Sequence, residues 1–285
     1  DKLHAIYNGG SRETILAKIV AAIGDRGLLN VIWNGVPFDA GIELSLVYPR
    51  PSAAFDRKAA DLYDENTLSV MDEVRHKEGE RIDLAIFLNG LAIFTMELKC
   101  ESSATGWDYR DAIKQYKFER DCKTRLLAPK IGALAHFAMD LHEVWACSAL
   151  KGPASKFLPF NKGVRAQGAS HETRAGNPER RDGIATAYMW EEILTKDAIF
   201  SLIYDFVYYA RNHRTNKKKD ETPIFPRFQQ YRAVTRIAED IRRNKTMRDY
   251  LVEHSADPGR DHFMERVNSR HGAHTIEAAE ALGVG

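Results

Sequence analysis

Runs of apolar residues mark several strands along the first 160 residues. The segments at 81–88 and 91–98 contain near-continuous apolar runs, and the segment at 66–76 also reads as a strand. Between 81–88 and 91–98 stands the dipeptide Asn89-Gly90, a strong signal for a β-hairpin. Further strands are predicted at 41–49, 131–140, 142–150 and, as a shorter piece, 156–160.

Helices are predicted where apolar residues recur three and four positions apart. In the segment 107–127, the residues with this spacing are Tyr109, Ala112, Ile113 and Tyr116. Helices are also predicted at 11–27, 188–212 and 228–244, and the polar stretch at 50–65 has room for a short helix. Residues 161–185 are polar and rich in glycine, which predicts a loop. Strands followed by a helix and then by more strands indicate an α/β domain built on a mixed sheet.

The composition is that of a globular protein without a global charge field. The 285 residues are 44% hydrophobic, and 41 Lys and Arg stand against 40 Asp and Glu. Any contact with nucleic acid must therefore come from local patches. The three cysteines (Cys100, Cys122 and Cys147) form no C-x-x-C pair, which argues against a zinc site and a disulfide framework and favours a reducing cytoplasm. No segment predicts a membrane span.

Three charged residues interrupt the predicted hairpin. Asp83 lies inside the first strand, and Glu97 and Lys99 lie at the end of the second. Since side chains alternate along a strand, Glu97 and Lys99 point to the same side. Two carboxylates that converge beside a lysine repel each other unless a cation bridges them or one of them is protonated. Oxygen ligands of this kind suit Mg²⁺. The group then has the parts for phosphodiester hydrolysis.

The spacing of these residues is a weak pattern by itself, because strand ends often carry solvated charges. Two features strengthen the catalytic interpretation. An aspartate inside an apolar strand is costly without a partner. The next predicted helix carries Gln115 on the flank of its apolar stripe, where it either faces the same site or is an ordinary boundary residue.

The register of the hairpin decides whether these carboxylates can meet. With a two-residue turn, Asp83 would pair with Met96 and face away from Glu97. We therefore predict a three-residue loop, in which Gly90 adopts a left-handed bulge conformation and Asp83 pairs with Thr95. Asp83 is then diagonal to Glu97 on one face of the sheet.

Several segments, in order along the chain, carry a resemblance to a known family. They read IDLAIFLNGLAIFTMELK, DAIKQY, LAHFAMD, FLPFNKG, AGNP, TAYMWEEIL and IFPRFQQYRAV. Together they resemble the N-terminal part of the motor (R) subunit of type I restriction endonucleases, over residues 12–256. Because several separate motifs occur in sequence, the resemblance is specific.

The resemblance implies the PD-(D/E)xK restriction-endonuclease-like fold, an α/β mixed sheet flanked by helices, followed in this chain by a helical extension. It implies that Asp83, Glu97 and Lys99 are the metal-binding and catalytic residues, with Asp83 and Glu97 as ligands of Mg²⁺. Gln115 matches the glutamine of the family's Q-x-x-x-Y element and is expected to be catalytic too. The tyrosine of that element is Glu119 in this chain, although Tyr116 lies nearby.

A second part of the resemblance concerns ATP, a cofactor of the full-length family. FPRFQQ resembles the adenine-sensing motif that precedes the helicase domains, with Arg227 and Gln230 at the matching positions. In HSADPGRD, where the family has its phosphate-binding loop, Asp257 replaces the first glycine and Arg260 the lysine. Pro258 has no N–H to donate to a phosphate. We therefore expect no ATP hydrolysis by this chain.

By the same resemblance the chain divides into three parts. Residues 1–165 are expected to form the nuclease domain, 166–219 a loop, a long helix and a basic linker, and 220–285 a remnant of the start of the helicase motor domain. Because nearly all of both motor domains is missing, we expect a fragment or a truncated form of the R subunit.

The function that the resemblance implies is a Mg²⁺-dependent DNA endonuclease domain without sequence specificity of its own. Its expected partners are double-stranded DNA and the methyltransferase and specificity subunits of the restriction complex. Two alternatives stay open: a catalytically silent module that docks on DNA or the methyltransferase, and a stand-alone nuclease of the same fold. The basic segment 211–220, with Arg174, Arg180 and Arg181, either follows the DNA backbone or is solvated surface.

Overall fold

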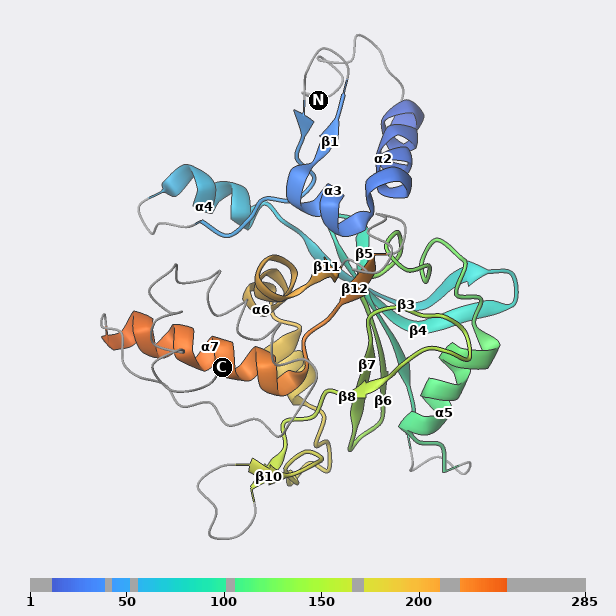
Figure 1. Ribbon diagram of the computed structural model, residues 1–285, viewed down its shortest axis with the longest axis vertical. Coiled ribbons are helices and arrows are strands. Elements are labelled where there is room, and N and C mark those ends of the chain that lie inside the picture. The colour runs from blue at the N-terminus through green and yellow to red at the C-terminus, as the bar shows by residue number, and fades with distance from the viewer. Residues whose placement is uncertain are drawn as a thin grey trace.

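A six-stranded mixed sheet forms the centre of the computed structural model, which describes residues 12–38, 43–51, 56–100, 106–165, 172–210 and 221–244. The strand order is β3-β4-β5-β6-β7-β8 (Figure 1). β5 and β6 are parallel, and all other neighbours are antiparallel. The strands are β3 (Leu68–Lys77), β4 (Glu80–Leu88), β5 (Leu91–Leu98), β6 (Ala135–Met139), β7 (Val144–Cys147) and β8 (Leu158–Pro159). The predicted α/β architecture with a mixed sheet is confirmed.

One face of the sheet is covered by the crossover that joins the parallel strands β5 and β6. Its helical part is α5 (Tyr109–Lys114) followed by the π-helix η2 (Gln115–Glu119). Asp108 caps α5 in a capping box with Asp111, which satisfies backbone donors of the first turn. The predicted helix at 107–127 is too long, because the backbone becomes extended at Arg120 and Asp121 then accepts a hydrogen bond from the backbone N of Lys123.

The opposite face packs against helices from the second half of the chain (Figure 1). They are η3 (Met189–Ile193), α6 (Lys196–Ser201), η4 (Leu202–Phe206) and α7 (Phe228–Asn244). The single helix predicted at 188–212 is wrong: Thr195 is extended, and its hydroxyl accepts a hydrogen bond from Ala198 N, so a new helix starts there. The chain then leaves the helix at Val207 and forms β11 (Tyr208–Ala210), which pairs with β12 (Thr222–Ile224).

Smaller elements complete the description. The predicted helices at 11–27 and within 50–65 are confirmed as α2 (Arg12–Arg26) and α4 (Arg57–Asp64), and α3 (Leu28–Asn34) lies between them. The strand predicted at 41–49 shrinks to β2 (Glu43–Leu44), paired with β1 (Val36–Pro37). The segment predicted as a loop at 161–185 contains a short pair, β9 (Val164–Arg165) and β10 (Glu172–Arg174). The three-part division of the chain stays a prediction.

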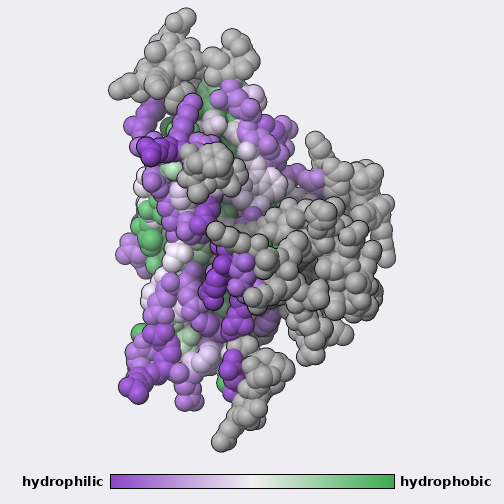
Figure 2. Space-filling model, turned by 90° about the vertical axis from the view of Figure 1, so that its left-hand side faces the viewer, coloured by the Kyte–Doolittle hydropathy of each residue, from purple (hydrophilic) through white to green (hydrophobic). Residues whose placement is uncertain are grey.

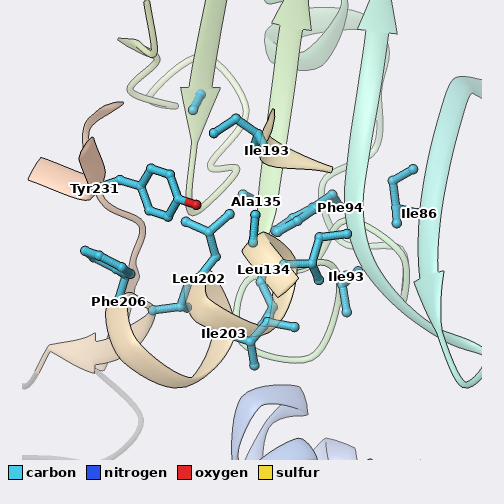
Figure 3. Close-up of a cluster of buried hydrophobic side chains, with 14 of the residues drawn as sticks. Ile86, Ile93, Phe94, Leu134, Ala135, Ile193, Leu202, Ile203, Phe206 and Tyr231 are labelled. Carbon is cyan, nitrogen blue, oxygen red and sulfur yellow. The ribbon is translucent and has the colours of Figure 1, made fainter. Parts of the chain in front are cut away.

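The largest of three hydrophobic clusters joins the sheet to the later helices. Figure 3 shows Ile86 and Phe94 of the sheet in one cluster with Leu202 and Ile203 of η4 and with Tyr231 of α7. Phe94 is fully buried and packs edge to face against neighbouring phenylalanine rings, an arrangement worth about 0.5–1.5 kcal/mol for each pair beyond burial. This core covers the face of the sheet opposite α5, whereas a smaller buried cluster, which includes Ala112 and Tyr116, packs the α5 face.

The α7 helix shows how this packing follows from the sequence. Its buried side chains recur every three or four positions, so they form one apolar stripe: Phe228, Tyr231, Val234, Ile237 and Ala238. Its remaining positions are mostly polar. Figure 2 shows that, on one side of the molecule, the described residues at the surface are mostly hydrophilic.

Candidate active site

The turn of the β4–β5 hairpin differs from its predicted form. Leu88 pairs directly with Leu91, so the turn contains two residues and the predicted three-residue loop is wrong. Asn89 and Gly90 both have positive φ angles, 49° and 83°, as the favoured two-residue hairpin turn requires. The Asn89 side chain also accepts a hydrogen bond from Thr67 N at 2.7 Å, which stabilises the tight turn.

A β-bulge in β5 restores the alignment that the two-residue turn would have destroyed. Phe87 pairs with Ala92, whereas Ile86 pairs with Phe94, so Ile93 is the extra residue. Its carbonyl accepts a hydrogen bond from Leu134 N at 2.8 Å. Beyond the bulge the register shifts by one, and Leu84 pairs with Met96. The adjacent positions are Asp83 and Glu97, which therefore lie opposite each other with side chains on the same face.

Asp83 connects the ends of the two strands. One of its carboxylate oxygens, Oδ2, accepts a hydrogen bond from Leu98 N at 2.7 Å and lies 3.9 Å from Lys99 Nζ. The Asp83 side chain is 31% exposed and that of Lys99 only 8%. Lys99 also lies over the ring of Trp107, with its ammonium 5.7 Å from the ring centroid. The predicted convergence of Asp83, Glu97 and Lys99 is thus present in the structure.

Glu97 is fully buried and has one charged partner. Its Oε1 accepts a hydrogen bond from Arg120 Nε at 2.7 Å, whereas no described residue hydrogen-bonds to Oε2. Burial and the nearby Asp83 carboxylate raise the pKa of Glu97 to about 7, against the opposing influence of Arg120. The ionised form of Glu97, beside Asp83, is therefore one that a further positive charge would stabilise.

Sequence reasoning missed Arg120. It follows the last residue of η2, and its side chain is 13% exposed at the ion pair with Glu97. Nothing in the local pattern distinguishes it from the other basic residues of the segment, Lys117 and Lys123. The early end of the helix at Glu119 directs this arginine toward the sheet.

Gln115 begins the π-helical turn on the helix that covers this face. Its Oε1 is buried, and no described residue hydrogen-bonds to it. The next residue, Tyr116, points into the core, where its hydroxyl lies 2.9 Å from Thr95 Oγ1. Thr95 Oγ1 also lies 2.7 Å from Nδ1 of His136, whose pKa burial lowers to about 3, so that this imidazole is neutral. Tyr116 thus ties the helix to β5 on the face that carries Glu97.

The donor set fits a hard cation. Asp83 and Glu97 supply carboxylate oxygens, and one buried oxygen of Glu97 has no partner among the described residues. Among the described residues, no group of three or more His, Cys, Asp or Glu side chains is arranged to hold a metal ion. Two carboxylates are enough for Mg²⁺, because this ion keeps several of its waters.

Comparison with known proteins shows what this region is similar to. The family described as type I restriction enzyme R protein N terminus matches residues 56–155, which include β3 to β7, α5 and η2. Residues 56–155 are thus similar to the N-terminal region of type I restriction enzyme R proteins. A protein of Methanocaldococcus jannaschii, named as a type I restriction enzyme MjaVIIIP endonuclease subunit, is 24% identical over 199 residues, 66% of this chain. The chain spans only 16% of that relative's length.

Two further predicted residues, Arg227 and Gln230, lie away from the carboxylates. Gln230 Oε1 accepts a hydrogen bond from Arg227 N at 3.0 Å, at the start of α7, so Gln230 caps this helix. Because α7 packs on the face of the sheet opposite α5, the structure does not bring Arg227 and Gln230 to Asp83. Their role toward adenine stays a prediction.

The structure describes only part of the basic residues that were predicted to follow the DNA backbone. The segment 211–220 and the phosphate-loop-like segment 254–261 lie outside the described residues. Arg180 is engaged in ion pairs with Asp182 and Glu191, at 3.0 and 2.8 Å, which neutralise it locally. No helix in the described ranges combines the length and the apolarity that crossing a membrane requires.

Proposed function

We propose that the chain is a Mg²⁺-dependent DNA endonuclease domain of a type I restriction system, with the PD-(D/E)xK fold. The observation that carries the proposal is the convergence of Asp83, Glu97 and Lys99 at the adjoining ends of β4 and β5. The name of the M. jannaschii relative, an endonuclease subunit of a restriction enzyme, supports the same reaction.

Each residue has a distinct role in this proposal. Asp83 and Glu97 would hold Mg²⁺, which when bound supplies a Lewis acid for the scissile phosphate and lowers the pKa of bound water. Lys99 is shielded from solvent beside Asp83, where its positive charge stabilises the negative charge that develops on the phosphate. Gln115, with its unpartnered oxygen, would orient water or substrate.

The proposed partners follow from membership in a restriction system. We propose that the domain acts on double-stranded DNA in the cytoplasm, without sequence specificity of its own, next to methyltransferase and specificity subunits. ATP belongs to the motor of the full-length family, and we expect no ATP hydrolysis by this chain.

A catalytically silent docking module is the second candidate, and one observation favours it. Both carboxylates already have partners in the protein, Asp83 with Leu98 N and Glu97 with Arg120. A domain built only to bind DNA would keep these contacts permanently.

DNA cleavage decides between the two candidates. The purified chain is incubated with supercoiled plasmid in Mg²⁺ or in EDTA, and nicking is followed over time. We expect cleavage in Mg²⁺ alone, and a loss of at least about a hundredfold in Asp83→Ala and Lys99→Ala. Asp72→Ala, which removes an exposed carboxylate of β3, is the matched control and should cut normally. DNA binding without any Mg²⁺-dependent cleavage would favour the silent module.

A further inference from the structure

The ion pair between Arg120 and Glu97 is unusual because it occupies one carboxylate oxygen of a proposed metal ligand. Arg120 Nε donates to Glu97 Oε1 at 2.7 Å, and the two side chains are 13% and 0% exposed. Charge-assisted hydrogen bonds in such shielded places are strong. In the metal-free protein, the guanidinium therefore already serves as the counter-ion of Glu97.

Contacts next to Arg120 hold it in place. Asp121 N donates to Glu80 Oε2 at 2.7 Å, and Lys77 Nζ lies 3.0 Å from Glu80 Oε1 and 3.1 Å from Asp121 Oδ2. These bonds join the chain just after Arg120 to the turn between β3 and β4. The arginine is thus fixed from both sides, by η2 before it and by this turn after it.

The four charges of the site balance in pairs. Lys99 lies beside Asp83, and Arg120 lies beside Glu97. A divalent cation that enters between the carboxylates is attracted by them and repelled by the guanidinium. At short range this repulsion is substantial even in a medium of high dielectric constant.

We propose that Arg120 is a positioning residue that competes with the metal ion for Glu97: it neutralises and orients this carboxylate in the metal-free protein, and its charge weakens cation binding. This inference rests on the proposed function, because it takes Glu97 to be a metal ligand. It adds a residue to the site and makes a prediction about affinity that is independent of DNA cleavage.

The test is the affinity of the protein for Mn²⁺, measured by calorimetry at pH 8.5 without DNA. Arg120→Gln removes the charge and should bind Mn²⁺ about tenfold or more tightly than the wild type. Arg120→Lys keeps the charge and should stay within about threefold of the wild type. Arg180→Gln is the matched control, since Arg180 also pairs with carboxylates, and should leave the affinity unchanged.

Different failures have different meanings. If Mn²⁺ binds to the wild type and Glu97→Gln abolishes binding, but Arg120→Gln has wild-type affinity, the competition is refuted and the proposed metal site stands. If the wild type binds no Mn²⁺, or Asp83→Asn and Glu97→Gln leave binding unchanged, the metal site and the competition both fall. If Arg120→Gln is unfolded in EDTA, we expect added Mn²⁺ to restore the circular dichroism of the folded protein, because the metal replaces the lost counter-ion of Glu97. If the signal does not recover, the inference is overturned.

Discussion

Glu97 should make the stability of the metal-free protein depend on pH. Its pKa is raised from 4.5 to about 7, so the folded state binds a proton that the unfolded state has already lost in this range. The stabilisation from this proton is fully present below pH 4.5 and is lost as the pH rises through about 7. The pKa change corresponds to roughly 3 kcal/mol, without reduction for solvent screening because Glu97 is fully buried.

Replacing Glu97 with glutamine isolates this contribution. The glutamine does not ionise, so whatever it costs through packing or the Arg120 contact is the same at every pH. The free energy of unfolding of Glu97→Gln minus that of the wild type should therefore rise by roughly 3 kcal/mol between pH 4.5 and pH 8. The difference rises because the wild type loses the contribution of the Glu97 proton over this range, whereas the variant has no such contribution to lose.

Urea unfolding in EDTA, followed by circular dichroism at several pH values, measures this difference. Phe118→Ala serves as the control, since Phe118 is 65% exposed and does not ionise, and its difference from the wild type should not vary with pH. A Glu97→Gln difference that stays constant within about 0.5 kcal/mol would refute the reasoning about the buried carboxylate.

Three further substitutions test the packing around the site, all by urea unfolding at one pH. Gly90→Ala should cost about 1–2 kcal/mol, because Gly90 has a φ of 83° although no atom lies within 4 Å of the added Cβ; no cost would contradict the turn geometry. Tyr116→Phe should cost about 1–2 kcal/mol through the lost buried hydrogen bond to Thr95, and an unchanged midpoint would argue against that bond. Phe94→Ala should cost about 3–5 kcal/mol, and a cost below about 1 kcal/mol would mean that Phe94 is not in the core.

Much of the sheet was predictable because its signals are local. The strands at 66–76, 81–88 and 91–98 have their hydrophobic pattern within a few residues, and the 17 residues of α7 carry a regular apolar stripe. The break at Thr195 was not predictable in the same way. A threonine inside an amphipathic pattern is ordinary, and whether it caps a new helix depends on how the flanking segments pack.

The candidate site was predicted in its residues but not in the way they meet. Asp83, Glu97 and Lys99 were identified by the chemistry of charges inside apolar strands. The bulge at Ile93 that brings the carboxylates to one face involves Leu134, a residue far along the chain, so the local sequence carries no sign of it. For the same reason Arg120 was missed, since its place depends on Glu80 and the turn between β3 and β4.

The central claim is that the bulged hairpin brings Asp83 and Glu97 together as ligands of one divalent cation. Crystals of the chain soaked in Mn²⁺, with anomalous diffraction collected near the manganese edge, test it directly. We predict a single strong peak within coordination distance of both carboxylates. No peak at this place at millimolar Mn²⁺, or a peak bound only by other residues, would contradict the account.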